Sequence, residues 1–393
     1  MLIERCDPSL TKASTAERSS DHGQAGREGW GRTLSTRHQL IWVGIDAGKG
    51  HHWAVDISSR PSALLLTLLL AHGQPVVYIP GKTVNRMTGA YLGEGKTDAK
   101  DARVIADLAR LRRDFRPIAP SVELTSGLQL LVGYRQDLIA DRVQLINRLR
   151  EILVGICPAL ERAFEYRKRP GLVLLTGYQT PAAIRRMGVK RLADWLARRN
   201  IRTAVVFAER AVEAAASQHT ALPGEGLAAK LVKELADRIL ELDERIKENE
   251  QAITALFRTD ERAEIIESLP GMGQILGAEF LAIVGDMSTH KDAGHLAAHA
   301  GLAPVPRDSG RRTNNLHRPK HYNRRLRHIF YMSAHVSMTL PGPSQEYYCK
   351  KRGEGLIHTQ AVLSLARRRV DVLWAMLRDK RLFTTAPPVP VSA

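Results

Sequence analysis

Apolar and polar positions divide the chain into a segment of alternating strands and helices, followed by a long helical segment. Between residues 39 and 118, short β-branched runs such as 42–45 and 74–79 alternate with helical stretches at 63–70 and 104–111. This alternation predicts a partly parallel sheet with helices packed on it. From about residue 119 onward, apolar residues recur every three or four positions, which predicts helices. We therefore expect an α/β domain plus an all-α region.

The most regular helical repeat lies between residues 228 and 256. Its apolar positions alternate three and four apart, with β-branched residues at one seam position and leucine at most of the other. That choice favours a two-stranded coiled coil, in which Asn249 would help to fix the register. We expect a coiled coil, either between copies in a homo-oligomer or as a hairpin. The alternative is an amphipathic helix packed within one subunit.

Changes in composition suggest five regions, which differ in their periodicity. The first is rich in Ser, Thr, Arg, Glu and Gly without periodicity, which predicts a disordered leader. The last is rich in Pro and Val and is expected to be flexible. The regions are a leader at 1–38, an α/β domain at 39–118, a helical and coiled-coil region at 119–262, a C-terminal domain at 263–383 and a tail at 384–393.

The charge balance points to a polyanionic partner. Lysine and arginine number 58 against 41 acidic residues in 393, for a net charge of +17. Such an excess suits DNA or RNA. The strongly apolar run at 63–71 is too short to span a bilayer, so we expect no membrane association. Three scattered cysteines and the lack of a signal-peptide pattern favour a reducing cytoplasm.

Three aspartates, Asp46, Asp98 and Asp101, form the candidate metal site. Asp46 follows an apolar, strand-like run, as does a further acidic residue, Asp56. Asp98 and Asp101 stand three residues apart at the start of a predicted helix, behind Thr97 as its N-cap, so their side chains share one face. Adjacent carboxylates repel each other, which raises one pKa unless a cation lies between them. Oxygen ligands of this kind suit Mg²⁺, although Asp98 and Asp101 could instead only complement the helix dipole.

A Leu-Pro-Gly-x-Gly turn opens the C-terminal domain. It resembles the hairpin of helix-hairpin-helix modules, in which glycines let the backbone approach a phosphate. This interpretation makes Gly271 and Gly273 nucleic-acid-binding candidates. The alternative is a tight turn between two helices with no ligand.

The positive charge is concentrated between residues 301 and 352, where eleven basic residues face two acidic ones. The aromatic residues Tyr322, Phe330, Tyr331, Tyr347 and Tyr348 are interleaved with them and could stack on unpaired bases. We expect this segment to contact nucleic acid. The candidate contacts are Arg307, Arg311, Arg312, Arg318, Lys320, Arg324 and Arg325.

Four motifs occur in an order that resembles the DEDD transposases of bacterial insertion sequences. They are the Val-Gly-Ile-Asp motif at 43–46, Gly-Lys-Thr-Asp-Ala-Lys-Asp-Ala-Arg at 95–103, Ser-Leu-Pro-Gly-Met-Gly at 268–273 and Ala-Gly-Leu-Ala-Pro at 300–304. The likeness extends over residues 39–383. It implies an N-terminal ribonuclease-H-like, or RuvC-like, domain, a coiled coil for assembly and a helical C-terminal transposase domain.

The resemblance also implies roles for individual residues. Asp46, Asp56, Asp98 and Asp101 would bind Mg²⁺, and Ser309, between arginines in the basic segment, would attack a phosphodiester and become linked to DNA. A structured guide RNA from the flank of the element would pair with donor and target DNA. From the sequence alone, a serine in this setting is otherwise a turn residue, because it needs activation to act as a nucleophile.

One departure from the family pattern concerns the spacing of the first two aspartates. A ribonuclease-H-like path between them needs roughly 40–50 residues at ordinary strand and loop lengths, whereas Asp46 and Asp56 are ten apart. Either a hairpin is missing and the domain is shortened, or Asp56 is not the second ligand. The alternatives to an active transposase are a defective nucleic-acid-binding remnant, a RuvC-like nuclease without strand transfer, and an actin-like ATPase or sugar kinase, which shares the Gly-Ile-Asp-x-Gly strand.

Overall fold

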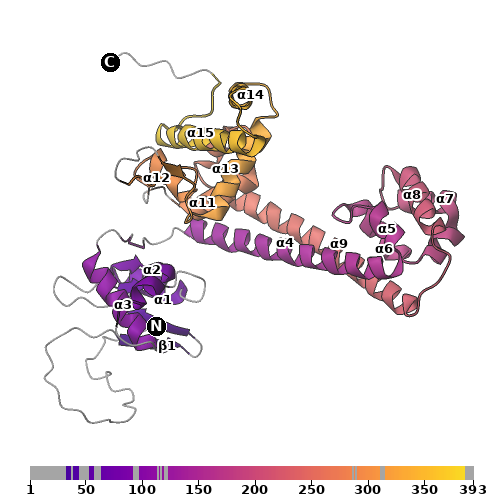
Figure 1. Cartoon of the computed structure of the whole chain (residues 1–393), viewed down its shortest axis with the longest axis horizontal. Helices are drawn as coiled ribbons and strands as arrows, with labels where there is room; N and C mark the ends of the chain where they lie inside the picture. Colours follow the sequence, from indigo (N-terminus) through magenta and orange to yellow (C-terminus); the bar gives the residue numbers. More distant parts are fainter. Residues whose placement is uncertain are drawn as a thin grey trace, which may run out of the picture. The chain divides into compact units, whose positions relative to one another are not determined.

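The computed structural model describes residues 32–36, 39–43, 53–56, 63–91, 97–112, 115, 117–118, 123–285, 287, 290–309 and 315–385. The chain forms two compact units, residues 1–120 and 121–393 (Figure 1). Among the described helices, none combines the length and the apolar character needed to cross a membrane. Each unit is described by itself below.

The first unit mixes short strands with helices. Strands β1 and β2 pair antiparallel, whereas β3 and β4 pair parallel, so the described strands form two separate two-stranded sheets. The α/β character predicted for this region is confirmed, but a single ribonuclease-H-like sheet is not seen among these strands. The elements are β1 (Arg32–Thr36), β2 (Gln39–Val43), β3 (Trp53–Val55), α1 (Ala63–Ala71), β4 (Val76–Tyr78), α2 (Gly81–Thr88) and α3 (Asp98–Leu111).

Two expectations for this unit need correction. Strand β1 lies inside the stretch predicted to be a disordered leader, because β2 supplies backbone partners that local composition does not reveal. The run of leucines in helix α1 by itself predicts a buried helix, yet Leu64 is 74% exposed and Leu68 45% exposed. Only one of its described leucines, Leu69, is fully buried, since a single face of the helix packs on the apolar cluster of β3 and β4.

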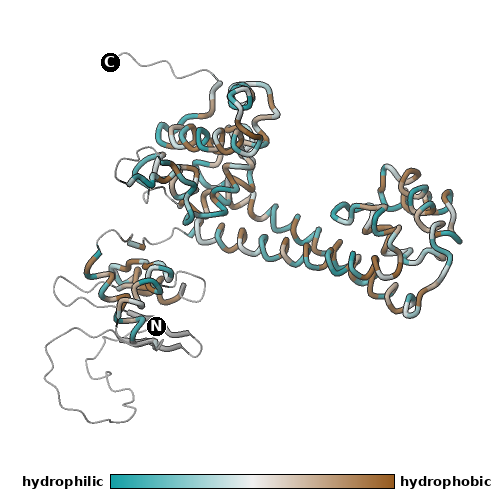
Figure 2. Tube along the Cα trace, viewed as in Figure 1, coloured by the Kyte–Doolittle hydropathy of each residue, from teal (hydrophilic) through white to brown (hydrophobic). Residues whose placement is uncertain are grey.

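The second unit is built on two long helices, α4 (Glu123–Ile156) and α9 (Glu225–Phe257), which pack side by side (Figure 1). The helices are antiparallel, because residues with increasing numbers on α4 form ion pairs with residues of decreasing number on α9. Arg135 bonds Glu250 at 2.6 Å, and Arg142 bonds Asp243 further along. Apolar and polar residues interleave along both helices (Figure 2).

The α9 seam is therefore occupied within the chain. Its apolar residues Val232, Leu235, Ile239 and Ile253 are buried, as is Asn249, whose Oδ1 has no hydrogen-bond partner in the described part of the chain. In the structure α9 packs against α4 of the same chain, which is the packing within one subunit that the sequence left open as an alternative. The seam is not left exposed for a second copy, and an oligomer formed through it stays a prediction.

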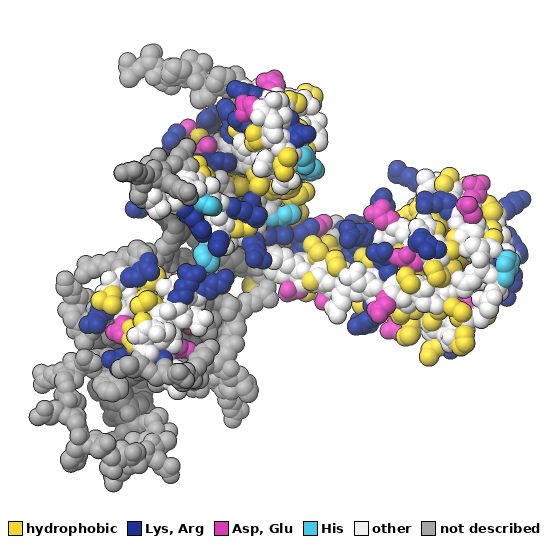
Figure 3. Space-filling model, viewed as in Figure 1, with side chains coloured by type: hydrophobic (Ala, Val, Ile, Leu, Met, Phe, Trp, Pro, Cys, Tyr) yellow, Lys and Arg dark blue, Asp and Glu magenta, His cyan; other side chains and the backbone are white. Residues whose placement is uncertain are grey.

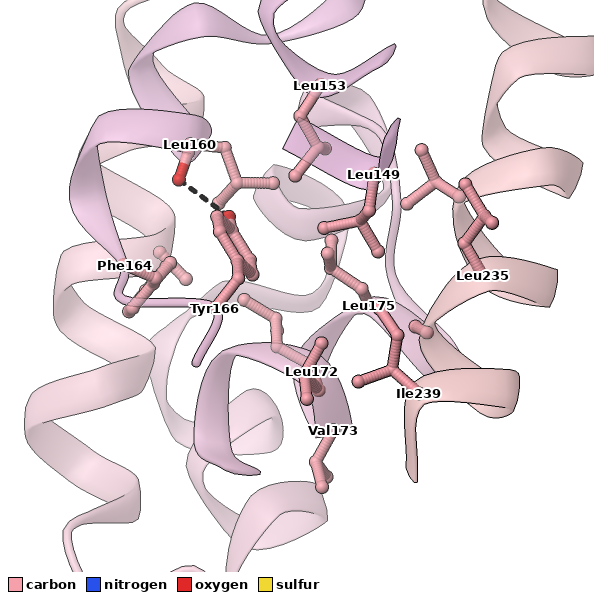
Figure 4. Close-up of a cluster of buried hydrophobic side chains, with 14 of the residues drawn as sticks. Leu149, Leu153, Leu160, Phe164, Tyr166, Leu172, Val173, Leu175, Leu235 and Ile239 are labelled. Atoms are coloured by element: carbon pink, nitrogen blue, oxygen red, sulfur yellow. Dashed lines mark hydrogen bonds between the residues drawn. The ribbon is translucent and has the colours of Figure 1, made fainter. Parts of the chain in front are cut away.

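Helices α5 to α8 form a subdomain at the far end of the long pair (Figure 1). Its core joins leucines of α4 and α9 to Leu160, Leu172 and Tyr166, whose hydroxyl donates to the Leu160 carbonyl at 2.8 Å (Figure 4). The bounds are α5 (Pro158–Ala163), α6 (Arg169–Gly177), α7 (Pro181–Ala197) and α8 (Ala204–Ala216).

The C-terminal elements pack at the opposite end of the pair, where Gln129 of α4 donates to the Ala282 carbonyl at 2.9 Å. The predicted boundary at 262/263 consequently does not separate two compact units, because α11 packs on both α4 and α9. The elements are α10 (Ala263–Ser268), α11 (Gln274–Val284), α12 (Ala293–His299), β5 (Val305–Pro306), β6 (Leu316–His317), α13 (Arg324–Ser337), α14 (Pro343–Gly353) and α15 (His358–Arg378).

A buried arginine holds the Pro-Gly turn between α10 and α11. Arg369 of α15 is 3% exposed and donates to the Pro270 carbonyl and to the Ser333 hydroxyl. Burial lowers the pKa of Arg369 to about 10, so it stays charged at neutral pH. Gly271 has a φ of +78° and lies against α13, where a β-carbon would stand 2.6 Å from the Ser333 carbonyl oxygen.

We expect Gly271→Ala to lower the free energy of unfolding by about 2–4 kcal/mol, because the added methyl group meets backbone and the left-handed conformation is strained for alanine. The matched control is Gly273→Ala, where φ is −72° and no atom lies within 4 Å of the added carbon. It should cost about 1 kcal/mol or less. Denaturant unfolding followed by circular dichroism checks both, and equal losses would contradict this account of the turn.

Candidate active site and nucleic-acid interface

Two of the four predicted metal ligands, Asp56 and Asp101, lie in the described part of the first unit. Asp56 follows strand β3, and Asp101 lies in the first turns of α3, where Thr97 caps the helix by accepting from the Lys100 amide at 3.3 Å. Burial raises the pKa of the Asp56 carboxyl, and the negative charge of Asp101 raises it further. Asp101 is therefore near enough to Asp56 for its charge to act on that carboxyl. The pair predicted from the sequence was Asp98 with Asp101, and it stays a prediction.

The other two predicted ligands are Asp46, which lies outside the described residues, and Asp98, whose side chain lies outside them. Within the part of the chain that is described, no three His, Cys, Asp or Glu side chains gather in a way that could hold a metal ion. The donor chemistry of the Asp56–Asp101 pair nevertheless fits a hard divalent cation, since a bound cation would relieve their mutual repulsion.

Thr88 is a neighbour of this site that the sequence did not reveal. Its hydroxyl donates to the Val84 carbonyl at 2.9 Å and lies 3.5 Å from Asp101 Oδ1. The contact depends on the packing of α2 against α3. No motif marks Thr88 in the sequence.

Ser309 lies in the loop of the β5–β6 hairpin and is exposed. The Asp308 carboxylate accepts from the Asn315 amide at 2.8 Å, and the Arg307 amide donates to the Asn315 carbonyl at 2.9 Å. These bonds join the two sides of the loop beside the serine. Ser309 is thus exposed to solvent on a hairpin whose two sides are hydrogen-bonded to each other. The neighbouring candidates Arg311 and Arg312 lie outside the described residues.

Several predicted nucleic-acid contacts lie around Tyr322. Arg318 donates to the Tyr322 hydroxyl at 2.9 Å, and the Arg327 guanidinium stands 5.0 Å from the centre of the ring. The hydrogen bond from Arg318 holds the pKa of the Tyr322 hydroxyl below its ordinary value, and the charge of Arg327 adds to this. Arg307, Arg318, Lys320 and Arg324 are exposed.

Two predicted nucleic-acid contacts make structural contacts instead, Arg325 partly exposed and Phe330 buried in the core. Arg325 pairs with Glu279, which is fully buried in α11 and also stands 3.6 Å from Arg135. Arg325 therefore has a structural role, because the buried Glu279 carboxylate would be costly without a partner of opposite charge. Phe330 is fully buried and packs edge-to-face on Phe280, so it offers no face to a base.

The two glycines of the Pro-Gly turn differ in their surroundings. Gly271 packs so closely against α13 that a larger residue would not fit there, whereas Gly273 is exposed at the start of α11. Free backbone amides at this helix end remain available to a phosphate beside Gly273. A phosphate contact at Gly273 stays a prediction.

Two segments of the chain match transposase families. Residues 47–158, which include Asp56 and Asp101, match the DEDD model of IS110 transposases, and residues 263–349, which include Ser309, match the "Transposase IS116/IS110/IS902 family". The matched regions therefore contain the carboxylate pair in one unit and the serine hairpin in the other.

Insertion-element proteins are similar over most of their length. An uncharacterized 44.8 kDa protein of IS116 from Streptomyces clavuligerus is 64% identical over 399 residues, covering 92% of this chain and 100% of the relative. An uncharacterized 42 kDa protein of IS900 from Mycobacterium paratuberculosis is 45% identical over 88% of this chain and 98% of the relative. The mini-circle putative transposase for IS117 of Streptomyces coelicolor is 30% identical over 73% and 72%.

The match to the IS116 protein also contains a length difference. The alignment is 399 positions long, but it covers only 92% of the 393 residues of this chain, which is roughly 362 residues. About 37 positions of the relative therefore have no counterpart in this chain. With both family matches in order and relatives aligned over most of their length, the chain belongs to the IS116/IS110/IS902 family of insertion-sequence transposases, proteins of DNA transposition and recombination.

Proposed function

We propose that this transposase cuts and rejoins DNA by attack of Ser309 on a phosphodiester, assisted by Mg²⁺ at the aspartates of the first unit. The observation that carries the proposal is the Asp56–Asp101 pair, in which the charge of one carboxylate raises the pKa of the other. A carboxyl whose pKa is raised by burial and by a neighbouring carboxylate is typical of functional sites, including sites for cations. The exposed Ser309 hairpin supplies the second half of the chemistry.

The aspartates would hold the metal and organise the phosphate. Asp56 and Asp101 provide two of the ligands, and Asp46 and Asp98 are proposed as the others. Mg²⁺ bound there would polarise the phosphate oxygens and stabilise charge on the attacking and leaving oxygens. The pKa of Asp56 is raised above its ordinary value, so ionisation of this carboxyl destabilises the folded protein as the pH rises through that pKa.

Ser309 would carry the bond exchange. Its Oγ forms a bond to phosphorus and loses its proton, while the bond from phosphorus to one deoxyribose oxygen breaks and that oxygen leaves as a hydroxyl. The reverse attack by a hydroxyl on another strand end releases the serine and rejoins DNA. The exposed Arg307, two residues away, is placed to hold the phosphate.

The partner proposed to choose the target is a structured RNA from the flank of the element. Base pairing would then supply sequence specificity, while exposed cations such as Arg318, Lys320 and Arg324 contact backbone phosphates. The family resemblance supports this partner. Transposition in the presence of the flanking RNA, and none without it, tests the RNA independently of the catalytic residues.

A second candidate is favoured by the length difference from the IS116 protein. About 37 aligned positions lack a counterpart here, a size close to the hairpin that the Asp46–Asp56 spacing lacks. If these positions fall there, the chain is a shortened copy that still binds nucleic acid but does not cut it. A plasmid excision assay with the unmutated chain decides between an active and a defective copy.

For an active chain, Ser309→Ala should abolish excision and the covalent protein–DNA adduct seen on denaturing gels, while DNA binding stays unchanged because the hairpin bonds do not involve the serine side chain. Asp101→Asn should abolish cutting as well. Cleavage that survives Ser309→Ala but not Asp101→Asn would identify a RuvC-like nuclease without serine chemistry.

The carboxylate pair can also be tested without any activity. In Asp101→Asn, the pKa of Asp56 should fall, because a negative charge that raises it has been removed. The matched control is Asp107→Asn on the same helix, whose carboxylate accepts from the Tyr91 hydroxyl at 2.8 Å.

Carbon-detected NMR titration measures the pKa of Asp56, and calorimetry measures Mg²⁺ binding. We expect Mg²⁺ binding to weaken in Asp101→Asn and to persist in Asp107→Asn. An unchanged pKa of Asp56 in both variants would refute the proposed pair.

A further inference from the structure

The subdomain formed by α5 to α8 contains a cavity of about 520 Å³. The end of α4, the α5–α6 connection and α8 enclose it. Its lining is mostly basic and aromatic and includes Arg150, Arg162, Arg167, Lys168, Arg210 and Phe207. One carboxylate, Glu165, also lines it and pairs with Lys168 at 2.7 Å. The sequence offered no motif in this region, and the proposed chemistry does not use the cavity.

The subdomain is itself strongly basic. Between residues 157 and 218 there are 12 lysines and arginines against 5 acidic residues, which supplies a large part of the net charge of the chain. Figure 3 shows lysine and arginine side chains around this end of the long helix pair. Such a density of positive charge favours a polyanion over a neutral ligand.

Only part of this charge is used inside the protein. Arg150 pairs with the buried Glu161 at 2.7 Å, and Arg210 donates to the Ala163 carbonyl at 2.6 Å. Among the described residues, the guanidinium groups of Arg162 and Arg167 have no hydrogen-bonded or ion-pair partner. These two exposed side chains are therefore available to a phosphate.

A rigid aromatic stack stands beside the free cations. The Phe164 and Phe207 rings lie 5.3 Å apart with an angle of 12° between their planes, and the Arg210 guanidinium stands 5.6 Å from the Phe164 ring. Phe164 is fixed in the core next to Tyr166 (Figure 4), whereas Phe207 is only partly buried. Stacked rings next to unpaired arginines suit an unpaired base and its phosphate, since bases stack on aromatic faces while cations hold the backbone.

The cavity lies well apart from the C-terminal elements. Gln129 bonds the C-terminal part and Arg150 lines the cavity, and 21 residues of α4 separate them. At the rise of an α-helix, this distance is about 30 Å. One nucleic-acid strand that reached both places would extend along the helix pair.

We propose that this cavity is a second nucleic-acid site, which binds a single-stranded DNA or RNA segment by holding a phosphate between Arg162 and Arg167 and stacking a base on Phe207. The site goes beyond strand cutting, because it needs neither Ser309 nor the aspartates. Its role is to anchor a strand away from the place of chemistry.

Photocross-linking with the full chain tests the location. The probes are a twelve-nucleotide oligothymidylate and the matching oligouridylate, each with one 5-iodouracil, and the cross-linked peptides are identified by mass spectrometry. We expect cross-links at Phe207 with at least one probe, and the probe that reacts identifies DNA or RNA as the ligand. Cross-links confined to residues 290–385 with both probes would overturn the proposal.

The salt dependence of binding tests the role of the cations. The double variant Arg162→Ala and Arg167→Ala should reduce the slope of log affinity against log salt by about 1.4, as expected for two lost contacts to a single strand. The control is Lys230→Ala with Arg238→Ala, which removes two exposed charges on α9 outside the cavity and should leave the slope unchanged. Equal slopes for the two double variants would refute the site.

Phe207→Leu separates stacking from charge. Leucine keeps an apolar contact with Phe164 but offers no ring, so single-strand affinity should fall about fivefold with the salt slope unchanged. Circular dichroism verifies that each variant is folded. Binding and cross-linking are measured here, so a chain that cannot cut DNA would still answer the question.

Discussion

The antiparallel contact between α4 and α9 is the interaction on which the second unit depends. The two helices meet across about a hundred residues of sequence, through buried leucines and isoleucines and through ion pairs such as Arg135–Glu250 and Arg142–Asp243. One end of the pair carries the α5–α8 subdomain, and the other carries the elements around Ser309. Losing this contact would separate the proposed distal site from the elements around Ser309.

Positive charge serves two purposes in this chain. Arg325 and Arg135 neutralise the charge of the buried Glu279. The buried Arg369 donates a hydrogen bond to the Pro270 carbonyl and so stabilises the Pro-Gly turn. Burial of the Glu279 charge is tolerated because Arg325 and Arg135 pair with its Oε1, although Oε2 has no hydrogen-bond partner among the described residues. The exposed cations of the hairpin region and of the distal cavity are the ones left to meet phosphates. A count of charge along the sequence does not separate these two groups.

The proposed chemistry joins two compact units that each contribute one half. The first unit supplies the carboxylates, and the second supplies the serine on an exposed hairpin. Membership of the insertion-sequence transposases accounts for both halves occurring in one chain.

The sequence by itself determined the class of elements, the helix behind Thr97, the repeat in α9 and the family, because these depend on local periodicity and on ordered motifs. It also placed Asp56 and Asp101 in one candidate site. Only the tertiary structure decided which partner α9 takes, because a seam of this kind fits a second copy or the same chain equally well. It likewise decided that Arg325 and Phe330 make structural contacts and that Phe164 and Phe207 stack beside free arginines, since contacts between residues far apart in sequence leave no local signal.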